Sequence, residues 1–579
     1  METKRPKPAH SADIVILGSG LAGTVLASVL ARNGADVLVI DAGSHPRFAI
    51  GESTIPYTSM LMRLVAERYN VPEIKWLATF EAVQSKVSTN SGVKRNFGFL
   101  YHRKGEKHDV TEANELPIPK ITNTENHFFR QEVDAWMVTV ALKYGARLVA
   151  NKKISNFAFD EDGVDVIAED GDVIRAKFVV DASGFRSPLA QQFDLREQPS
   201  RLRHHSRSLF THMVDVTPYD DLVRPRGAHG NHQRWNEGTL HHLFEGGWIW
   251  VIPFNNHVRA TNPLVSVGLS LDPRIHPPVE GLTPEEEFRK FIADYPDIEK
   301  QFTHARSVRE WVSTGRLQYS SKQTVGYRWC LTSHAAGFID ALFSRGLSNT
   351  FEIVNALGWR LLDALRDDDF AVERFEFVQT LEQGLLDFND DLVANAYASF
   401  QDYDLWNAWF RVWSISQRLA IFEINRAYAR FLGDKDVESV KRLERLAVNG
   451  VCPEYPPAVA MFAQANQELR DVAEGRKDSK VAAANVMSLL QNADFIPPAL
   501  GLGDPDNRCI HVTGPKVLEM LRWAKKDAPP EIGELAFEGI TLFLKKRLSL
   551  KEFALLDEIK HTLAPLPVIG RPLRVPAPR

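Results

Sequence analysis

The amino-acid sequence predicts an α/β protein in which a parallel sheet covered by helices is followed by a second, antiparallel sheet and a helical C-terminal region. Three observations predict this fold. Apolar strand patterns alternate with helical patterns from about residue 13 to residue 181, which favours a parallel sheet. Short strand patterns separated by Pro and Gly follow over about 201–313. After about residue 369 the pattern is helical and rich in Leu, Ala, Phe and Trp, and it ends in a Pro-rich segment, 565–579.

The first strand pattern, residues 14–17, runs directly into Gly18-x-Gly20-x-x-Gly23 and a helical pattern. In a Rossmann-like fold the first glycine permits the tight turn, the second lets the backbone approach a pyrophosphate, and the third lets helix and strand pack closely. The phosphate then lies at the positive end of the helix. Asp41 ends the next strand pattern, where a carboxylate binds ribose hydroxyls. These residues predict a dinucleotide site.

Two stretches with strand periodicity complete the predicted sheets. Residues 155–180 alternate apolar and polar positions around Asp-Gly turns, which is typical of an antiparallel meander, and the last strand ends at Asp181. Residues 239–254 read TLHHLFEGGWIWVIPF and belong to the predicted second sheet.

Composition narrows the class of protein. A formal net charge of −5 supplies no basic excess to attract nucleic acid or anionic lipid. The three cysteines, Cys330, Cys452 and Cys509, are too few and too scattered for a disulfide framework or a thiolate zinc site. Neither a hydrophobic signal core nor an apolar run of about 18 residues is visible. We therefore expect a soluble cytoplasmic protein with no membrane span and no nucleic-acid partner.

Adjacent histidines occur twice, at 204–205 and 241–242. Neighbours on a strand point to opposite faces, and neither pair has the i, i+4 helical spacing of a zinc site. We predict no metal.

Four further segments carry a resemblance to a known family. HPRFAIGESTIP (45–56), Arg130-x-x-x-Asp134 and VVDASGFRS (179–187) resemble the FAD-binding segments of aromatic hydroxylases and halogenases. The run 247–253, GWIWVIP, matches the G-W-x-W-x-I-P motif that separates halogenases from hydroxylases. Over about residues 11–370 the chain therefore resembles the flavin-dependent halogenases. The resemblance implies an FAD-binding Rossmann-like fold of the group-A flavoprotein monooxygenase type.

The resemblance also implies places for individual residues. Arg47 and Arg130 are expected near the cofactor phosphates or the isoalloxazine edge, and Ser53 near the flavin. The second nucleotide-facing turn is expected at Asp181 and Gly184. Alternate strand positions put two tryptophan rings on one side. There they would form a wall beside the flavin, made of Trp248, Trp250 and Phe343.

The implied reaction uses FADH2, supplied by a separate NAD(P)H-dependent flavin reductase, with O2 and chloride or bromide. Halide becomes hypohalous acid, and a lysine amine delivers the halogen to an electron-rich ring. Lysine suits this role because burial readily lowers its pKa. The run 93–99, VKRNFGF, best fits the register of the family's lysine and indicates Lys94, while Lys75 and Lys86 remain alternatives.

The segment 337–347, GFIDALFSRGL, resembles the halogenase segment that flanks the flavin. In the family, backbone N–H groups after the serine bind halide; here they belong to Arg345 and Gly346. Ser344 corresponds to the serine that hydrogen-bonds toward the lysine, so Lys94 and Ser344 are the expected catalytic pair.

The chain departs from the family pattern at two places. Tryptophan halogenases carry a glutamate where this chain has Phe343, which favours a phenol or pyrrole substrate, free or tethered to an acyl or peptidyl carrier protein. Ser333 and His334 stand where many flavoproteins of this class have Gly-Asp.

We thus expect a catalytic unit over 1–370, with its substrate-side sheet at about 201–313, and a mostly helical region over 371–579. Two alternatives remain open: an FAD-dependent monooxygenase that hydroxylates an aromatic ring, and a non-catalytic flavoprotein. A halogenase forms a product only when halide is present, a hydroxylase forms an oxygenated product without halide, and a non-catalytic flavoprotein forms no product.

Overall fold

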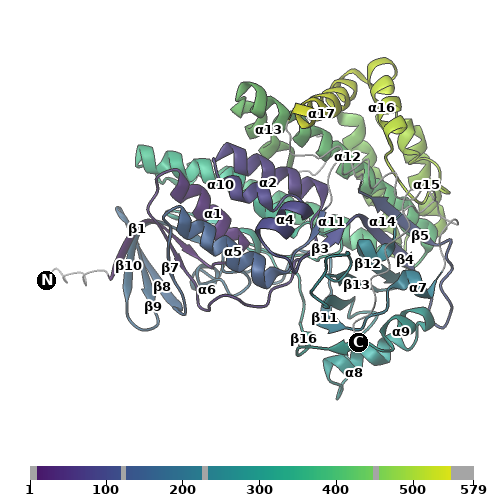
Figure 1. Ribbon diagram of the computed structural model, residues 1–579, viewed down its shortest axis with the longest axis horizontal. Helices are drawn as coiled ribbons and strands as arrows, with labels where there is room; N and C mark the ends of the chain where they lie inside the picture. Colours follow the sequence, from purple (N-terminus) through teal and green to yellow (C-terminus); the bar gives the residue numbers. More distant parts are fainter. Residues whose placement is uncertain (1–8, 119–124, 224–232, 448–454, 550–579) are drawn as a thin grey trace, which may run out of the picture.

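The computed structural model describes residues 9–118, 125–223, 233–447 and 455–549. Cys452 and the Pro-rich segment 565–579 therefore lie outside the described residues. Figure 1 shows three parts: a sheet with its covering helices at the left, a second sheet at the lower right, and C-terminal helices above it.

The first sheet has the strand order β17-β18-β10-β1-β2-β7. Its centre is parallel, and β8 and β9 join β10 as an antiparallel meander, so both predicted patterns are confirmed. Helix α1 packs against α5 and α10. The bounds are β1 (His10–Leu17), α1 (Leu21–Arg32), β2 (Val37–Ile40), α5 (Arg130–Lys143), β7 (Arg147–Val149), β8 (Ile154–Asp160), β9 (Gly163–Ala168), β10 (Val173–Asp181), α6 (Pro188–Gln192), β17 (Val325–Gly326), β18 (Trp329–Leu331) and α10 (Gly346–Asp367).

The second sheet has the order β15-β11-β14-β13-β12-β4-β5, with β16 paired to β11. It extends beyond the predicted range of 201–313, because β4 and β5 come from much earlier in the chain. The β12–β4 pair is parallel, so this sheet is not purely antiparallel. The bounds are β4 (Asn96–Tyr101), β5 (Ala113–Pro117), β11 (Arg207–Val214), β12 (Thr239–Phe244), β13 (Gly247–Pro253), β14 (Val265–Leu271), β15 (Arg306–Ser307) and β16 (Val312–Ser313), with α7 (Tyr219–Leu222), α8 (Pro284–Ile292) and α9 (Pro296–Phe302) beside them.

Both faces of β13 are buried, which explains why its sequence is apolar throughout. Trp248 and Trp250 face the larger hydrophobic core, shared with α2 and α12, whereas Ile249 and Val251 face a separate core shared with α8 and α9. The strand therefore divides two cores, and the two tryptophans lie on the same side, as predicted.

A short two-stranded sheet lies between the large ones. It pairs β3 (Gly92–Lys94) with β6 (Glu125–His127) in antiparallel register. Helix α2 (Pro56–Arg68) precedes it and begins with Pro56, whose fixed φ and missing N–H suit the first helical position. Two shorter helices follow, α3 (Pro72–Trp76) and α4 (Phe80–Lys86).

The described part of the chain after residue 375 forms no β-strand and is mostly helical. Helix α12 (Tyr403–Asp434) begins where Asp402 accepts hydrogen bonds from the first free backbone N–H groups. Its aromatic side chains cover β4, with the Trp406 ring centroid 5.2 Å from that of Phe99. The other helices are α11 (Glu376–Ser399), α13 (Val437–Ala447), α14 (Pro456–Ala473), α15 (Ser479–Asn492), α16 (Gly514–Lys526) and α17 (Pro530–Ser549).

In the described ranges, no helix has the length and apolar character that crossing a bilayer requires.

Candidate active site

The three glycines of the β1–α1 turn have different surroundings. Gly18 has φ +95°, and a Cβ there would lie 2.6 Å from the Ala182 carbonyl oxygen. A Cβ on Gly23 would collide with the Gly18 carbonyl oxygen. Gly20 faces open space, with no atom within 4 Å of a Cβ. The first and third glycines are thus required by the protein's own packing, while the second leaves room for a ligand at the helix N-terminus, as a pyrophosphate needs.

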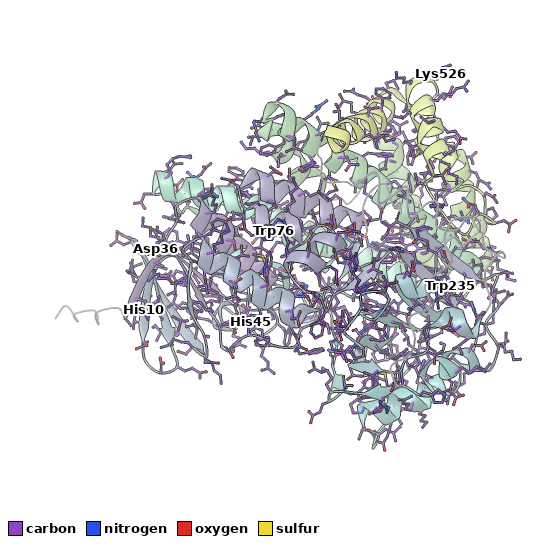
Figure 2. The ribbon with its side chains drawn as sticks, in the orientation of Figure 1. His10, Asp36, His45, Trp76, Trp235 and Lys526 are labelled. Carbon is purple, nitrogen blue, oxygen red and sulfur yellow. The ribbon has the colours of Figure 1, made fainter. Side chains whose placement is uncertain are left out.

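Asp41 lies at the end of β2 beside this turn. Its Oδ2 accepts from the Ser19 N–H at 2.7 Å and hydroxyl at 2.6 Å, and its Oδ1 accepts from Arg47 Nη1 at 2.6 Å. Burial alone would raise the pKa of Asp41, but the hydrogen bonds from Arg47 and Ser19 hold it below the ordinary value. His45 Nε2 lies 3.0 Å from Ser19 Oγ, and Figure 2 labels His45 at the lower edge of this part of the molecule. Arg47 therefore sits at the predicted ribose end of the site.

Arg130 uses four of its five guanidinium N–H bonds within the protein. Its Nε and Nη2 donate to both oxygens of Asp134 at 2.6 and 2.8 Å, and its Nη1 donates to the carbonyls of Ile50 and Gly51. The side chain thus ties the start of α5 to the segment that leads into Ser53.

Asp181 likewise serves the backbone around it. It is fully buried and accepts from Ser183 N–H and Oγ, from Ser187 Oγ at 2.6 Å, and from Leu189 N–H. These bonds shape the turn that contains Gly184, whose φ is +82°. The turn lies against Gly18, while both oxygens of the Asp181 carboxylate accept hydrogen bonds from residues of their own loop.

Lys94 on β3 is 0% exposed. Its Nζ donates to Ser53 Oγ at 2.6 Å and to the Thr54 carbonyl at 2.8 Å, and lies 3.2 Å from the centre of the Phe97 ring. Burial lowers the pKa of Lys94 well below its ordinary value, although the nearby Glu125 carboxylate opposes this. The amine is therefore buried, hydrogen-bonded on two sides and closed by an aromatic ring on the third.

The rival lysines have different surroundings. Lys75 donates to Glu67 at 3.0 Å, which is an ordinary ion pair. Lys86 is exposed and lies over the Trp76 ring, 4.4 Å from its centre. Of the three candidates, Lys94 alone is completely buried.

The hydrogen bonds of Lys94 continue into the protein. Ser53 Oγ lies 2.8 Å from Thr239 Oγ1, which lies 2.9 Å from His127 Nε2; His127 Nδ1 lies 2.9 Å from the Pro253 carbonyl oxygen. Ser53, predicted to lie near the flavin, thus contacts the lysine. Among the described residues no hydrogen bond joins Lys94 to Ser344, so the serine bonded to the lysine is Ser53.

Glu125 is the cross-strand partner of Lys94 on β6 and is also buried. Its Oε2 accepts from Ser59 Oγ at 2.5 Å and Thr54 Oγ1 at 2.9 Å. Burial raises the pKa of Glu125, while these hydrogen bonds and the charge of Lys94 lower it. Across the described ranges, Lys94 forms no direct ion pair with any carboxylate, so the charge of Glu125 acts on the amine without a hydrogen bond between them.

The aromatic residues of the predicted wall contact different partners. The rings of Trp248 and Trp250 lie 5.5 Å apart. Phe343 is buried and its ring centre lies 4.8 Å from that of Trp413 on α12, which lies 5.6 Å from Phe97. Phe97, Phe343 and Trp413 thus form an aromatic cluster that reaches the lysine amine, and one of its members comes from the C-terminal helices.

The turn before α10 has the backbone of an anion site. Ser344 has φ +54° and Arg345 is right-handed at φ −85°, a pairing in which successive N–H groups converge. No described group accepts a hydrogen bond from the backbone N–H of Arg345 or Gly346. Both residues line a pocket at the N-terminus of α10, together with His334 and residues of α11.

The Ser333–His334 departure also has a physical explanation. Ser333 has φ +56°, a left-handed conformation that glycine adopts without strain. The Ser333 N–H donates to Glu382 of α11 at 2.9 Å. His334 is exposed in the same pocket as Gly346.

Several residues of this site are absent from the sequence prediction: Thr239, His127, Glu125 and Trp413. They come from three segments, β6, β12 and α12, that only the fold brings together. The one local signal is the polar run Glu125–His127, since three polar residues directly before two phenylalanines are unusual for a buried strand. Within the described ranges, no group of three or more His, Cys, Asp or Glu residues could hold a metal ion.

Comparison with known proteins gives consistent results. Residues 11–263 match the FAD binding domain family. The chain is 49% identical to the tetracycline 7-halogenase of Kitasatospora aureofaciens, over 90% of this chain and 94% of the relative. It is 42% identical to the monodechloroaminopyrrolnitrin halogenase PrnC of Pseudomonas fluorescens, over 92% and 95%. The crystal structure of halogenase PltM in complex with phloroglucinol and FAD superposes with a TM-score of 0.81 at 34% identity, covering 86% of this chain and 99% of that chain.

Gly20 allows a direct test of the nucleotide site. We expect Gly20→Val to purify without flavin, because the new side chain fills the space left for the pyrophosphate without touching the protein. The visible absorbance spectrum and the thermal unfolding of the flavin-free protein are the measurements. The matched control is Gly23→Val, which should lower the stability of the flavin-free protein itself because its Cβ collides with the Gly18 carbonyl oxygen. Undiminished flavin in Gly20→Val would contradict the assignment.

Proposed function

The chain belongs to the flavin-dependent halogenases, FAD-binding oxidoreductases that act on aromatic substrates, and from this premise we propose that Lys94 delivers electrophilic halogen to a phenol- or pyrrole-type ring. The observation that carries the proposal is the complete burial of an amine that no described carboxylate contacts. A lysine that only contributed charge or solubility would be exposed or ion-paired. Lys75 and Lys86 have such ordinary surroundings, and Lys94 does not.

FAD, when bound and reduced, supplies with O2 the oxidising equivalents that convert chloride or bromide into hypohalous acid. The residues that would hold it are Gly18, Gly20 and Gly23 at the pyrophosphate, and Asp41 with Arg47 at the ribose. We expect a separate NAD(P)H-dependent reductase to deliver the reduced flavin, because the sequence has one complete Gly-rich dinucleotide fingerprint and we assign it to FAD. The halide binds to the backbone N–H groups of Arg345 and Gly346.

The surroundings of Phe343 support a phenol or pyrrole substrate. An apolar side chain at this position supplies no base, so the ring has to be activated by its own oxygen or nitrogen. The aromatic cluster of Phe97, Phe343 and Trp413 provides ring faces for stacking such a substrate. The related PltM binds phloroglucinol, a trihydroxybenzene, which points to the same class. The ring is free or tethered to an acyl or peptidyl carrier protein.

The test is a product assay. The protein is incubated with FAD, a flavin reductase, NADH, O2 and bromide, together with phenols, pyrroles and indoles offered free and as carrier-protein thioesters, and products are identified by mass spectrometry. We expect brominated phenols or pyrroles whose formation requires bromide. A halide-independent oxygenated product would favour a hydroxylase, and no turnover of any panel member, with flavin bound, would favour a non-catalytic flavoprotein.

Replacing Lys94 should separate halogen activation from halogen delivery. We expect Lys94→Ala to bind flavin and release hypohalous acid, while ring halogenation falls by about 100-fold or more because a group acting in the transition state is lost. Lys94→Arg should fail nearly as badly, since a guanidinium keeps its proton. Product yield per O2 consumed is the measurement.

The controls for this prediction are Lys75→Ala and Lys86→Ala. Both should halogenate at the wild-type rate, because neither amine is buried near the aromatic cluster. Loss of halogenation in one of these controls, with Lys94→Ala active, would move the role to that lysine; activity in all three variants would refute delivery by a lysine.

Ser344 tests the halide site. Its left-handed backbone costs a non-glycine residue on the order of 1–3 kcal/mol, and a β-branched side chain disfavours it further. We expect Ser344→Gly to keep the halide KM within about 3-fold of wild type, and Ser344→Val to raise it about 10-fold or more because the converging N–H groups are lost. Equal halide KM values for the two variants would show that the backbone at Ser344 does not hold the halide.

A further inference from the structure

We propose that His127 is a positioning residue for halogen delivery, which acts through Thr239 and Ser53 to keep hydrogen-bond donors away from the reactive position of the Lys94 nitrogen. The proposal rests on the proposed role of Lys94. It assigns a function to a buried histidine of β6 and a buried threonine of β12.

Four hydrogen-bonded contacts link Lys94, Ser53, Thr239, His127 and the Pro253 carbonyl in series, and the direction of each bond follows from the last acceptor. The Pro253 carbonyl can only accept, so His127 Nδ1 carries a proton. Burial lowers the pKa of His127 to about 3, with the charge of Lys94 acting in the same direction, so the imidazole is neutral. A neutral imidazole protonated on Nδ1 has an unprotonated Nε2, which can only accept. His127 is therefore the acceptor at the end of the chain.

The remaining bonds are then determined one after another. Thr239 Oγ1 donates its proton to His127 Nε2 across 2.9 Å, so it accepts from Ser53 Oγ across 2.8 Å. The single proton of Ser53 is used in that bond, and its oxygen accepts from Lys94 Nζ at 2.6 Å. Each group in this series therefore donates its proton toward the imidazole and away from the amine.

This direction has a consequence for the Lys94 nitrogen. Two of its N–H bonds are taken by Ser53 Oγ and the Thr54 carbonyl, both acting as acceptors. The third position, an N–H of the ammonium or the lone pair of the amine, faces the Phe97 ring and meets no hydrogen-bond donor among the described residues. Without its own acceptor, the Ser53 hydroxyl would turn toward Lys94, the amine would rotate its lone pair to accept from it, and the nucleophilicity of the amine would fall. His127 prevents that rotation from a distance of three hydrogen bonds.

The test uses substitutions that break the chain at Thr239. Thr239→Val keeps the size of the side chain but removes the acceptor of the Ser53 proton, and should lower halogenated product per O2 consumed by about 10-fold or more. Thr239→Ser restores a hydroxyl and should recover the wild-type yield. His127→Phe should resemble Thr239→Val. Flavin content verifies that each variant is folded, and Thr239→Val keeps the test valid if His127→Phe does not fold.

A double variant separates this role from a structural one. Ser53→Ala removes the hydroxyl that would block the amine, so adding Thr239→Val to Ser53→Ala should cause no further loss, and the double variant should exceed Thr239→Val alone. If Thr239 only stabilised the fold, the two losses would add. Wild-type yield in Thr239→Val, or additive losses in the double variant, would refute the proposal.

Lys94→Ala is measured alongside. Wild-type yield in Lys94→Ala would refute the proposed function itself. Loss in Lys94→Ala combined with wild-type yield in Thr239→Val would refute only the positioning role of His127.

Discussion

A fully buried amine needs hydrogen-bond acceptors, because removing an ammonium ion from water costs several kcal/mol even after the protein relaxes. The site is built around this constraint at Lys94. Two oxygen acceptors from the segment after Gly51 and the face of Phe97 surround the nitrogen, while Glu125 on the neighbouring strand is held back by two hydroxyl donors. A direct ion pair would stabilise the charged form and remove the amine from chemistry. The arrangement keeps the nitrogen buried without a direct ion pair to any described carboxylate.

The same constraint explains why the small β3–β6 sheet lies between the two large ones. Lys94 and His127 lie at opposite ends of the paired strands β3 and β6. Ser53 contacts both residues: its hydroxyl accepts from Lys94, and its backbone forms an antiparallel bridge with His127. The segment that carries Ser53 is held by Arg130, whose nitrogens are all engaged by Asp134 and by backbone carbonyls. Arginine is expected at such a position because its planar fork can hold several acceptors at once.

Residues close together in sequence were predicted well, and residues brought together by the fold were not. The β1–α1–β2 unit and its three glycines follow from local periodicity and from the steric demands of one turn. The place of β4 could not be predicted, because its neighbour β12 pairs with it from more than a hundred residues away. For the same reason Thr239 and Trp413 went unrecognised. Arg130 and Asp181 were recognised as belonging to the cofactor segments, yet both side chains are engaged with neighbouring backbone and carboxyl groups, and sequence alone does not distinguish a ligand contact from support of the loop beside it.

The aromatic contacts between α12 and β4 bear on how such a protein can change over evolutionary time. Trp406, Phe410 and Trp413 lie against Phe97 and Phe99, and these rings belong to one continuous apolar core. The C-terminal helices and β4 therefore share one set of aromatic contacts. Replacing the helices by those of a distant relative would change only one side of these contacts, and the rings would no longer fit together next to Phe97, which contacts the lysine. Chimaeras and directed-evolution libraries should vary β4 and α12 together, since a new substrate shape has to be accommodated by aromatic residues from two segments that lie about 300 residues apart in the chain.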